Sequence, residues 1–326
     1  MKGLTFRDVC EQSKAVYGQF GEKKWKPFSK ENANHPLRRD PNELKHCGVG
    51  KILVSAGMGS SLESQVDILK KYRNKYDLIT CDKGFRALLE HGIKADYVMI
   101  CDCNILWQKW APNEADTVGV KLISTPYGNV DWTRKWRGPI YFYLNRDAIK
   151  SEEIFADIIG TQTRMVPASS NVGNAQVVFM IGVDEYNTEP FAGYERIYLV
   201  GYDYSWPTDG NYYAWSNPIP KRHYMTSRTV VGIDGKLALT SENLVFSAKW
   251  LKQYIQAIGA PVYNCTPSGL LCIELKKLET ELFSFDPSLK NKIRSAYGLY
   301  LNARTMLKIA ENNVISVKEG LFNASR

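Results

Sequence analysis

Several motifs that define common enzyme classes are missing from this 326-residue sequence. Its seven cysteines are scattered and never form a Cys-x-x-Cys pair, which excludes zinc sites built from paired cysteines. There is no Gly-x-Ser-x-Gly, no His-Glu-x-x-His and no Gly-Lys-Ser/Thr after a glycine-rich turn. We therefore expect no serine-hydrolase elbow, no zinc-protease helix and no P-loop.

Long apolar runs and targeting segments are also missing from the sequence. No apolar run approaches the roughly 18 residues that a membrane span requires, and the first residues do not resemble a signal peptide. Unpaired cysteines within apolar stretches behave as small core residues. We therefore expect a cytoplasmic protein in a reducing compartment.

Acidic residues are outnumbered by basic ones. The 42 Lys and Arg residues against 34 Asp and Glu residues give a net charge of +8. This charge favours anionic partners such as nucleotides, nucleic acid or acidic glycans, and a merely basic surface is the alternative. The hydrophobic fraction of 44% is usual for a globular protein, and the length suits one large α/β domain with additions, or two domains.

The stretch 51–62 organises the rest of the chain. Its apolar first half predicts a buried parallel strand, and Gly57 and Gly59 follow at once. Ser60 or Ser61 would then cap a helix that begins directly afterwards. A strand, a glycine turn and a helix place backbone N–H groups in front of an anion, so we predict a phosphate or nucleotide site here. An ordinary tight turn is the alternative.

Strand and helix signals alternate from this stretch to about residue 265. Further strands are predicted at 78–82, 97–102, 118–124, 140–144, 196–203 and 262–265. Helices are predicted at 62–72, 85–91, 175–181 and 241–258. This alternation predicts a doubly wound, mainly parallel, Rossmann-like α/β sheet.

Aspartates end several of the predicted strands. Asp82 and Asp102 end strands that are neighbours in the sequence, so they could share one edge of the sheet. Carboxylates at that edge could hold Mg²⁺ against phosphates or bond a ribose. Asp203 ends a later strand in the same way. The alternative is that each carboxylate caps the turn that follows it.

The stretch 204–232 reads as a long loop rich in Tyr, Trp, Pro and Asn. Connections of this length within a compact domain are more often functional than idle. His223 lies in it beside Lys221 and Arg222, and a base near neutral pH beside cations suits proton transfer next to a phosphate-bearing leaving group. We predict a catalytic role for His223, and a solvated loop histidine is the alternative.

Three segments are expected along the chain: a basic N-terminal arm (1–48), a Rossmann-like nucleotide-binding catalytic domain (49–275) and a C-terminal helical extension (276–326). Lysines interleaved with Trp and Phe at 23–28 could contact DNA, although a solvated arm that packs its aromatics on the core is the alternative. A regular apolar seam in the extension predicts packing on the core as a helical cap, or on another copy of the chain.

Short motifs in a consistent order resemble one Rossmann-like family. Residues 57–62, Gly-Met-Gly-Ser-Ser-Leu, resemble its Gly-x-Gly-Pro-Ser-Leu turn. Residues 81–102 resemble its "Ala-Asp … Leu … Gly-Ile-x-Pro-Asp-Phe … Asp" region, and residues 171–174 with 197–203 resemble its second turn and strand. The family includes the MptE-like hydroxymethylpterin diphosphokinases and the motor-accessory-factor flagellin glycosyltransferases. The bacterial lipooligosaccharide sialyltransferases are its relatives.

This resemblance covers roughly residues 50–275, although Ser60 and Ala95 stand where the family has proline and residues 184–193 are inserted. Together with the arguments above it implies catalytic roles for His223, Asp102, Tyr212 and Tyr213. It implies donor or nucleotide contacts for Gly57, Gly59, Ser60, Ser61, Asp82, Arg164, Asn171, Asn174, Asp203 and Tyr204.

The favoured expectation is a transferase that uses a nucleotide-activated donor. We expect a glycosyltransferase that moves a sugar from a sugar nucleotide to an anionic acceptor, either a glycan or a nucleic acid. The alternative is an MptE-like diphosphokinase that uses ATP, with Mg²⁺ as a cofactor held by Asp82 and Asp102. A second alternative is a non-catalytic nucleotide-binding or nucleic-acid-binding protein.

Overall fold

The computed structural model describes residues 22–145, 164–166, 171–182, 189–215 and 227–286. The chain divides into two compact units, Met1–Phe285 and Asp286–Arg326, and the described helices and strands belong to the first. The first unit thus extends beyond the boundary expected at 275. His223 and the C-terminal apolar seam lie outside the described residues, so their roles stay predictions. Among the helices within these ranges, none has the length and apolarity that crossing a membrane requires.

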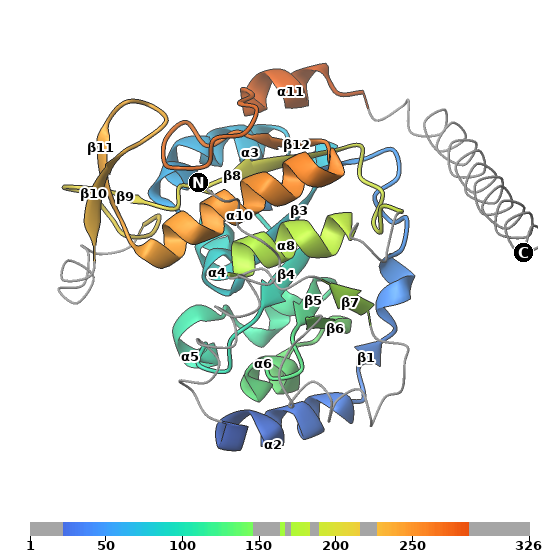
Figure 1. Ribbon diagram of the computed structural model, residues 1–326. Coiled ribbons are helices and arrows are strands. Elements are labelled where there is room, and N and C mark those ends of the chain that lie inside the picture. The colour runs from blue at the N-terminus through green and yellow to red at the C-terminus, as the bar shows by residue number, and fades with distance from the viewer. Residues whose placement is uncertain (1–21, 146–163, 167–170, 183–188, 216–226, 287–326) are drawn as a thin grey trace, which may run out of the picture. The chain divides into compact units, whose positions relative to one another are not determined.

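A parallel β-sheet forms the centre of the first unit (Figure 1). Its strands lie in the order β1-β6-β5-β4-β3-β2-β8-β12, and β7 pairs with β6. Each of these pairings is parallel. The strands are β1 Arg38–Arg39, β2 Ile52–Ala56, β3 Tyr76–Cys81, β4 Tyr97–Ile100, β5 Lys121–Ser124, β6 Ile140–Asn145, β7 Arg164–Val166, β8 Arg196–Val200 and β12 Val262–Asn264.

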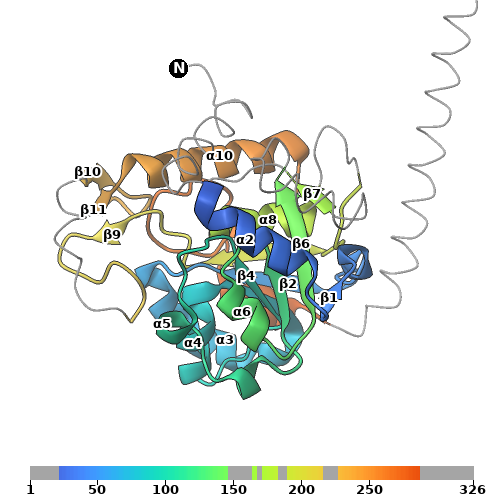
Figure 2. The same cartoon turned by 90° about the horizontal axis from the view of Figure 1, so that it is seen from below.

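Helices cover both faces of the sheet, because side chains of each strand alternate between two apolar cores. Val54 of β2 lies in the core that includes α3 and α4, whereas its neighbour Leu53 lies in the core that includes α8 and α10. Figure 2 shows α10 on one side of the sheet and α3, α4 and α6 on the other. This arrangement confirms the doubly wound α/β fold. The helices are α2 Glu22–Ala33, α3 Val66–Lys71, α4 Asp82–Glu90, α5 Trp107–Trp110, α6 Val130–Lys135, α8 Val172–Ile181, α10 Glu242–Ile258 and α11 Leu278–Ser284.

The order of the strands reverses next to β2. From β2 the chain moves outward through β3, β4, β5 and β6, and it then returns to place β8 on the other side of β2. Open α/β sheets bind ligands outside the carboxyl ends of their strands at such a switch point. The topology therefore places the candidate site at the ends of β2, β3, β4 and β8.

A small antiparallel sheet follows β8, with strand order β10-β11-β9. It consists of β9 (Trp206–Pro207), β10 (Arg228–Val231) and β11 (Leu237–Thr240). The expectation of an uninterrupted loop over 204–232 is therefore wrong near both of its ends. The strands escape sequence analysis because β9 has only two residues and β10 pairs with β11, which lies beyond the expected loop.

The described part of the expected N-terminal arm is built into the α/β unit. Strand β1 extends the sheet beside β6, and α2 packs near α6. There the buried Asn32 side chain donates hydrogen bonds to two backbone carbonyl oxygens and accepts one from Thr133 Oγ1. Residues 22–48 are therefore not a separate arm. A DNA contact through the basic residues at 23–28 stays a prediction.

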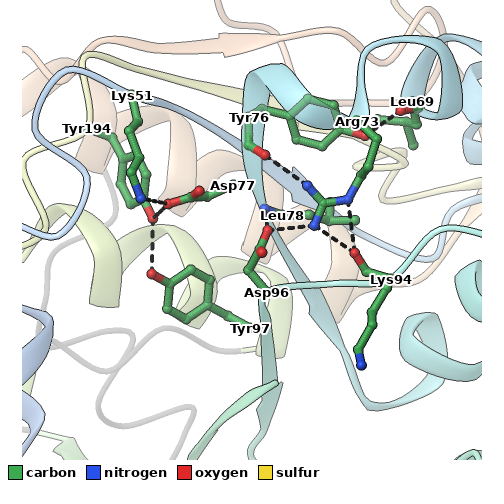
Figure 3. Close-up of polar contacts among 10 residues, drawn as sticks. All are labelled: Lys51, Leu69, Arg73, Tyr76, Asp77, Leu78, Lys94, Asp96, Tyr97 and Tyr194. Carbon is green, nitrogen blue, oxygen red and sulfur yellow. Dashed lines mark hydrogen bonds and ion pairs between the residues drawn. The ribbon is translucent and has the colours of Figure 1, made fainter. Parts of the chain in front are cut away.

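Two polar clusters hold the amino-terminal edge of the sheet, opposite the candidate site (Figure 3). In the first, Asp96 Oδ2 accepts hydrogen bonds from the Leu78 amide and from Arg73 Nη2, both at 2.7 Å. The same guanidinium donates to the carbonyl oxygens of Lys94 and Tyr76. This cluster connects the start of β3 to the loop before β4.

The second cluster connects the starts of β2, β3 and β4. Asp77 Oδ2 accepts from Lys51 Nζ at 2.8 Å and from the Tyr194 hydroxyl at 2.9 Å, and that hydroxyl lies 3.4 Å from the Tyr97 hydroxyl (Figure 3). Burial, together with the charge of Asp77, raises the pKa of Tyr194 well above its ordinary value. Burial also raises the pKa of Tyr97, so both tyrosines remain neutral hydrogen-bonding groups here.

Candidate active site at the carboxyl edge of the sheet

The glycine turn after β2 folds directly onto the end of β8. The Gly57 amide donates to the Val200 carbonyl at 2.9 Å, and the Gly59 amide donates to the Gly201 carbonyl at 2.9 Å. A Cβ atom on Gly57 would lie 2.5 Å from the Gly201 oxygen, so only glycine permits this approach of two backbones. Both amides, like the Leu62 amide that donates to the Gly59 carbonyl, are therefore used inside the protein and are not available to a phosphate at this turn.

Asp203 connects three segments at this edge. Its Oδ2 accepts from the Ser61 amide at 3.2 Å and the Ser61 hydroxyl at 2.8 Å, and its Oδ1 accepts from the Ser268 hydroxyl at 2.7 Å. Burial raises the pKa of this carboxyl group, and the hydrogen bonds to its charged form oppose the rise. Only 2% of Asp203 is exposed, so its main contacts are with the protein.

The expectation that Ser60 or Ser61 caps an α-helix is wrong. The turn leads into a 3₁₀ helix, η2 (Ser60–Gln65), which continues into α3 (Val66–Lys71), and Gly59 occupies the capping position of η2. No side chain caps either of these two described elements. The hydroxyl of Ser61 is directed to Asp203 instead.

The ends of β3 and β4 bring Asp82 and Asp102 to the same edge, as the sequence predicts. Asp82 is buried as the first residue of α4, and its Oδ1 accepts from the Lys83 amide at 2.6 Å. Asp102 is half-buried, and its Oδ1 accepts from the Asn104 amide at 2.7 Å and the Asn104 side chain at 3.0 Å. Burial and, to a smaller extent, the charge of Asp102 raise the pKa of Asp82 to about 6, although Lys83 opposes the rise.

Lys83 and Trp110 belong to this site although sequence reasoning missed them. Lys83 Nζ donates to the Tyr213 hydroxyl at 2.8 Å. It also lies 4.3 Å from the centre of the Tyr213 ring and 5.3 Å from the centre of the Trp110 ring. Contacts between a cation and two aromatic faces hold the ammonium group in one place. The signal that identifies Lys83 is a basic residue directly after a strand-end carboxylate.

Aromatic residues fasten the segment 212–215 over this edge. Tyr212 packs between Trp206 and Tyr213, with ring centres 4.6 and 4.5 Å apart. Trp215 stacks on His91 at the end of α4, with ring centres 4.2 Å apart. The segment is therefore attached both to the small sheet and to α4, which keeps Tyr213 beside Lys83.

Asn174 and Tyr204 form a buried pair behind the site. Asn171 caps α8, since its Oδ1 accepts from the Asn174 amide at 2.9 Å. The Asn174 side chain is fully buried: its Oδ1 accepts from the Tyr204 hydroxyl at 2.5 Å and its Nδ2 donates to the Ser247 carbonyl at 3.0 Å. The pair joins α8, α10 and the segment after β8. A donor contact through Asn174 or Tyr204 stays a prediction.

One predicted residue of the described ranges lies away from this edge. Arg164 belongs to β7, whose register places it opposite Tyr143 of β6, beyond β4 and β5 from the switch point. At the carboxyl edge the structure brings together four predicted residues, Asp82, Asp102, Tyr212 and Tyr213. Lys83 and Trp110, which were not predicted, lie beside them.

The donor set at this edge does not fit a resident metal ion. Within the described ranges, no group of three or more His, Cys, Asp and Glu side chains could hold one. Asp82 Oδ1 already accepts the Lys83 amide, and the Lys83 ammonium contributes positive charge next to it. Two carboxylates alone would leave Mg²⁺ dependent on phosphate oxygens and water for its other ligands.

The parallel sheet with helices on both faces defines this chain as a Rossmann-like α/β protein. Acidic, basic and aromatic side chains gather at its carboxyl edge, next to the switch point. The family model described as "6-hydroxymethylpterin diphosphokinase MptE-like" matches residues 29–209. This match covers more than half of the chain, and the chain belongs to that family. The matched range contains Asp82, Lys83, Asp102 and Tyr204.

A solved structure shares the fold. It is the MAf glycosyltransferase from Magnetospirillum magneticum AMB-1, with a TM-score of 0.54 and 14% sequence identity. The similarity covers 82% of this chain and 41% of that one, so the chain spans less than half the length of that glycosyltransferase. The resemblance inferred from the motifs is thereby confirmed. Comparison with curated proteins found no match.

Proposed function

We propose that this chain is a transferase that acts on a nucleotide-activated donor at the carboxyl edge of its sheet. The observation that carries the proposal is the gathering of Asp82, Lys83, Asp102 and Tyr213 beside the switch point. Open α/β sheets bind nucleotides at such places. The description of the family and the name of the structurally similar protein both denote transferases, which supports the same class of reaction.

The finer proposal is a glycosyltransferase that moves a sugar from a sugar nucleotide to an anionic acceptor. Asp102 is half-buried and would accept the proton of an acceptor hydroxyl. Asp82, with its pKa raised to about 6, would exchange a proton near neutral pH. Two titratable groups in different environments allow one site to supply both acid and base. His223 remains a predicted partner in this proton transfer.

An ATP-dependent diphosphokinase is the second candidate, favoured by the description of the family. Asp82 and Asp102 share one edge, and ATP would bring its own Mg²⁺ to them. The two candidates therefore differ in the nucleotide that binds and in whether that binding requires Mg²⁺.

Thermal unfolding of the full chain with CMP, UDP, GDP or ATP, each with Mg²⁺ or with EDTA, tests the proposal. A ligand present at a hundred times its Kd should stabilise the fold by about 2.7 kcal/mol. Stabilisation by CMP or UDP in EDTA supports the glycosyltransferase, and stabilisation by ATP only with Mg²⁺ supports the diphosphokinase. If no nucleotide stabilises the fold, the proposal is wrong, and salt-dependent binding to DNA would then test a non-catalytic role.

Turnover of the donor that binds tests the roles of the residues. Asp102→Asn should lower kcat by roughly 10²–10⁴ with little change in donor Kd, the usual effect of removing a general acid or base. Asp67→Asn is the matched control, because Asp67 is exposed on α3. A loss below about tenfold would remove Asp102 from the reaction.

A further inference from the structure

The ammonium group of Lys83 is a cation held in a defined position at the candidate site. It lies against the rings of Trp110 and Tyr213 and donates to the Tyr213 hydroxyl at 2.8 Å. These partners come from α5 and from the segment after β9, so three separate parts of the chain meet at this one charge. Such an arrangement fixes the position of a side chain that is otherwise flexible.

Lys83 keeps its charge although it is largely removed from water. Burial lowers the pKa of its ammonium group, but the Tyr213 oxygen and the Asp82 carboxylate outweigh burial, so the pKa lies above its ordinary value. A charged group that is partly desolvated interacts more strongly with an arriving anion than one in open water.

The neighbouring carboxylates have acceptor oxygens that are already hydrogen-bonded within the protein. Asp82 Oδ1 accepts from the Lys83 amide, and Asp102 Oδ1 accepts twice from Asn104. The ammonium of Lys83 has three hydrogens, and its one hydrogen bond within the described residues is to Tyr213. Lys83 can therefore donate to a further oxygen without losing its present position.

We propose that Lys83 is the fixed cation that binds the phosphate of the donor, and that it does so without a divalent metal ion. This inference rests on the proposed transferase function, and it assigns to Lys83 a role that a bound Mg²⁺ serves in many nucleotide enzymes. Tyr213 and Trp110 act as positioning residues, because both contact the ammonium group of Lys83.

Binding of inorganic pyrophosphate to the full chain in EDTA, measured by calorimetry, tests Lys83 directly. Lys83→Met should weaken this binding roughly 10- to 100-fold, the contribution of a charge-assisted hydrogen bond. Lys83→Arg retains the charge and should retain most of the affinity. The matched control is Lys109→Met, because Lys109 also lies over the Trp110 ring, at 4.9 Å, but is exposed. That variant should bind within about threefold of the wild type.

Near-UV circular dichroism of each variant checks that the fold is intact, and Lys83→Gln, which also removes the charge and should lose the same affinity, replaces Lys83→Met if that variant unfolds. The proposal is wrong if Lys83→Met binds pyrophosphate as the wild type does, if binding needs Mg²⁺, or if the wild type binds no pyrophosphate. If binding depends on Lys83 but no nucleotide or sugar nucleotide binds, the phosphate site stands and the transferase proposal fails.

Discussion

Gly59 lies so close to Asp203 that a Cβ atom on Gly59 would stand 1.8 Å from Asp203 Oδ2. The φ angle of Gly59 is −65°, which any residue adopts, so space and not backbone conformation requires glycine here. A glycine after a strand suggests room for a ligand phosphate. In this protein the room is filled by a buried carboxylate from the end of β8.

Gly59→Ala should therefore destabilise the fold as well as alter any ligand site beside it. We expect the free energy of unfolding to fall by about 1–3 kcal/mol, the usual effect of overpacking. The reason is that the Asp203 carboxylate must give up its hydrogen bonds to Ser61 and Ser268. Urea unfolding followed by circular dichroism measures the change. In the double variant with Asp203→Ala the clash with the carboxylate is absent, although the Gly201 oxygen still lies 2.8 Å from the Cβ position, so the combined loss should be smaller than the sum of the single losses. Additive losses would contradict the contact.

Asp82 should make the stability of the protein depend on pH. Burial raises its pKa from 3.8 to about 6, so the folded state favours the neutral acid. The stability contributed by that protonation is fully present below about pH 4 and is lost as the pH rises through about 6, a change of about 3 kcal/mol.

Asp82→Asn removes this titration. Its free energy of unfolding relative to the wild type should therefore be higher at about pH 7.5 than at about pH 4, as urea unfolding at the two pH values would measure. If the difference between variant and wild type is the same at both, then Asp82 titrates in the folded protein as it does in the unfolded chain.

Tyr204→Phe tests whether Tyr204 stabilises the position of α8 or contacts the donor. It removes the hydroxyl that donates to the buried Asn174, so the free energy of unfolding should fall by about 1–3 kcal/mol. Nucleotide affinity should stay the same if this pair only holds α8 in place. Tyr263→Phe is the control, because no hydrogen bond to the half-buried Tyr263 hydroxyl is found in the described part of the chain. A loss of affinity without a loss of stability would instead place Tyr204 in the donor site.

Asp96→Ala should lower the free energy of unfolding, although the Asp96 side chain is partly exposed. It leaves the Leu78 amide and the Arg73 guanidinium without their carboxylate, and we expect a loss of about 1–3 kcal/mol in chemical unfolding. Glu90→Ala is the comparison, because Glu90 pairs with Arg86 on the exposed surface of α4. That ion pair should contribute less than about 0.5 kcal/mol to the free energy of unfolding. Equal losses would show that Asp96 does not anchor the start of β3.

The fold and the position of the two carboxylates could be predicted because the sequence patterns that indicate them are local. Apolar runs that end at Asp82 and Asp102 indicate strands, and strands adjacent in the sequence from β2 to β6 are also adjacent in the sheet. Parallel strands joined by helices present their carboxyl ends at one edge, so the position of both carboxylates follows from the alternation of elements alone.

Only the tertiary structure decided what Gly59, Asp203 and Lys83 do. Ser61 and Asp203 are 142 residues apart, and they meet because β8 returns beside β2. Lys83 reaches Tyr213 across 130 residues. Residue patterns report local backbone preference and burial, whereas a hydrogen bond or a cation–ring contact requires positions accurate to a fraction of an ångström. Those positions depend on how the whole unit packs, so no local pattern contains them.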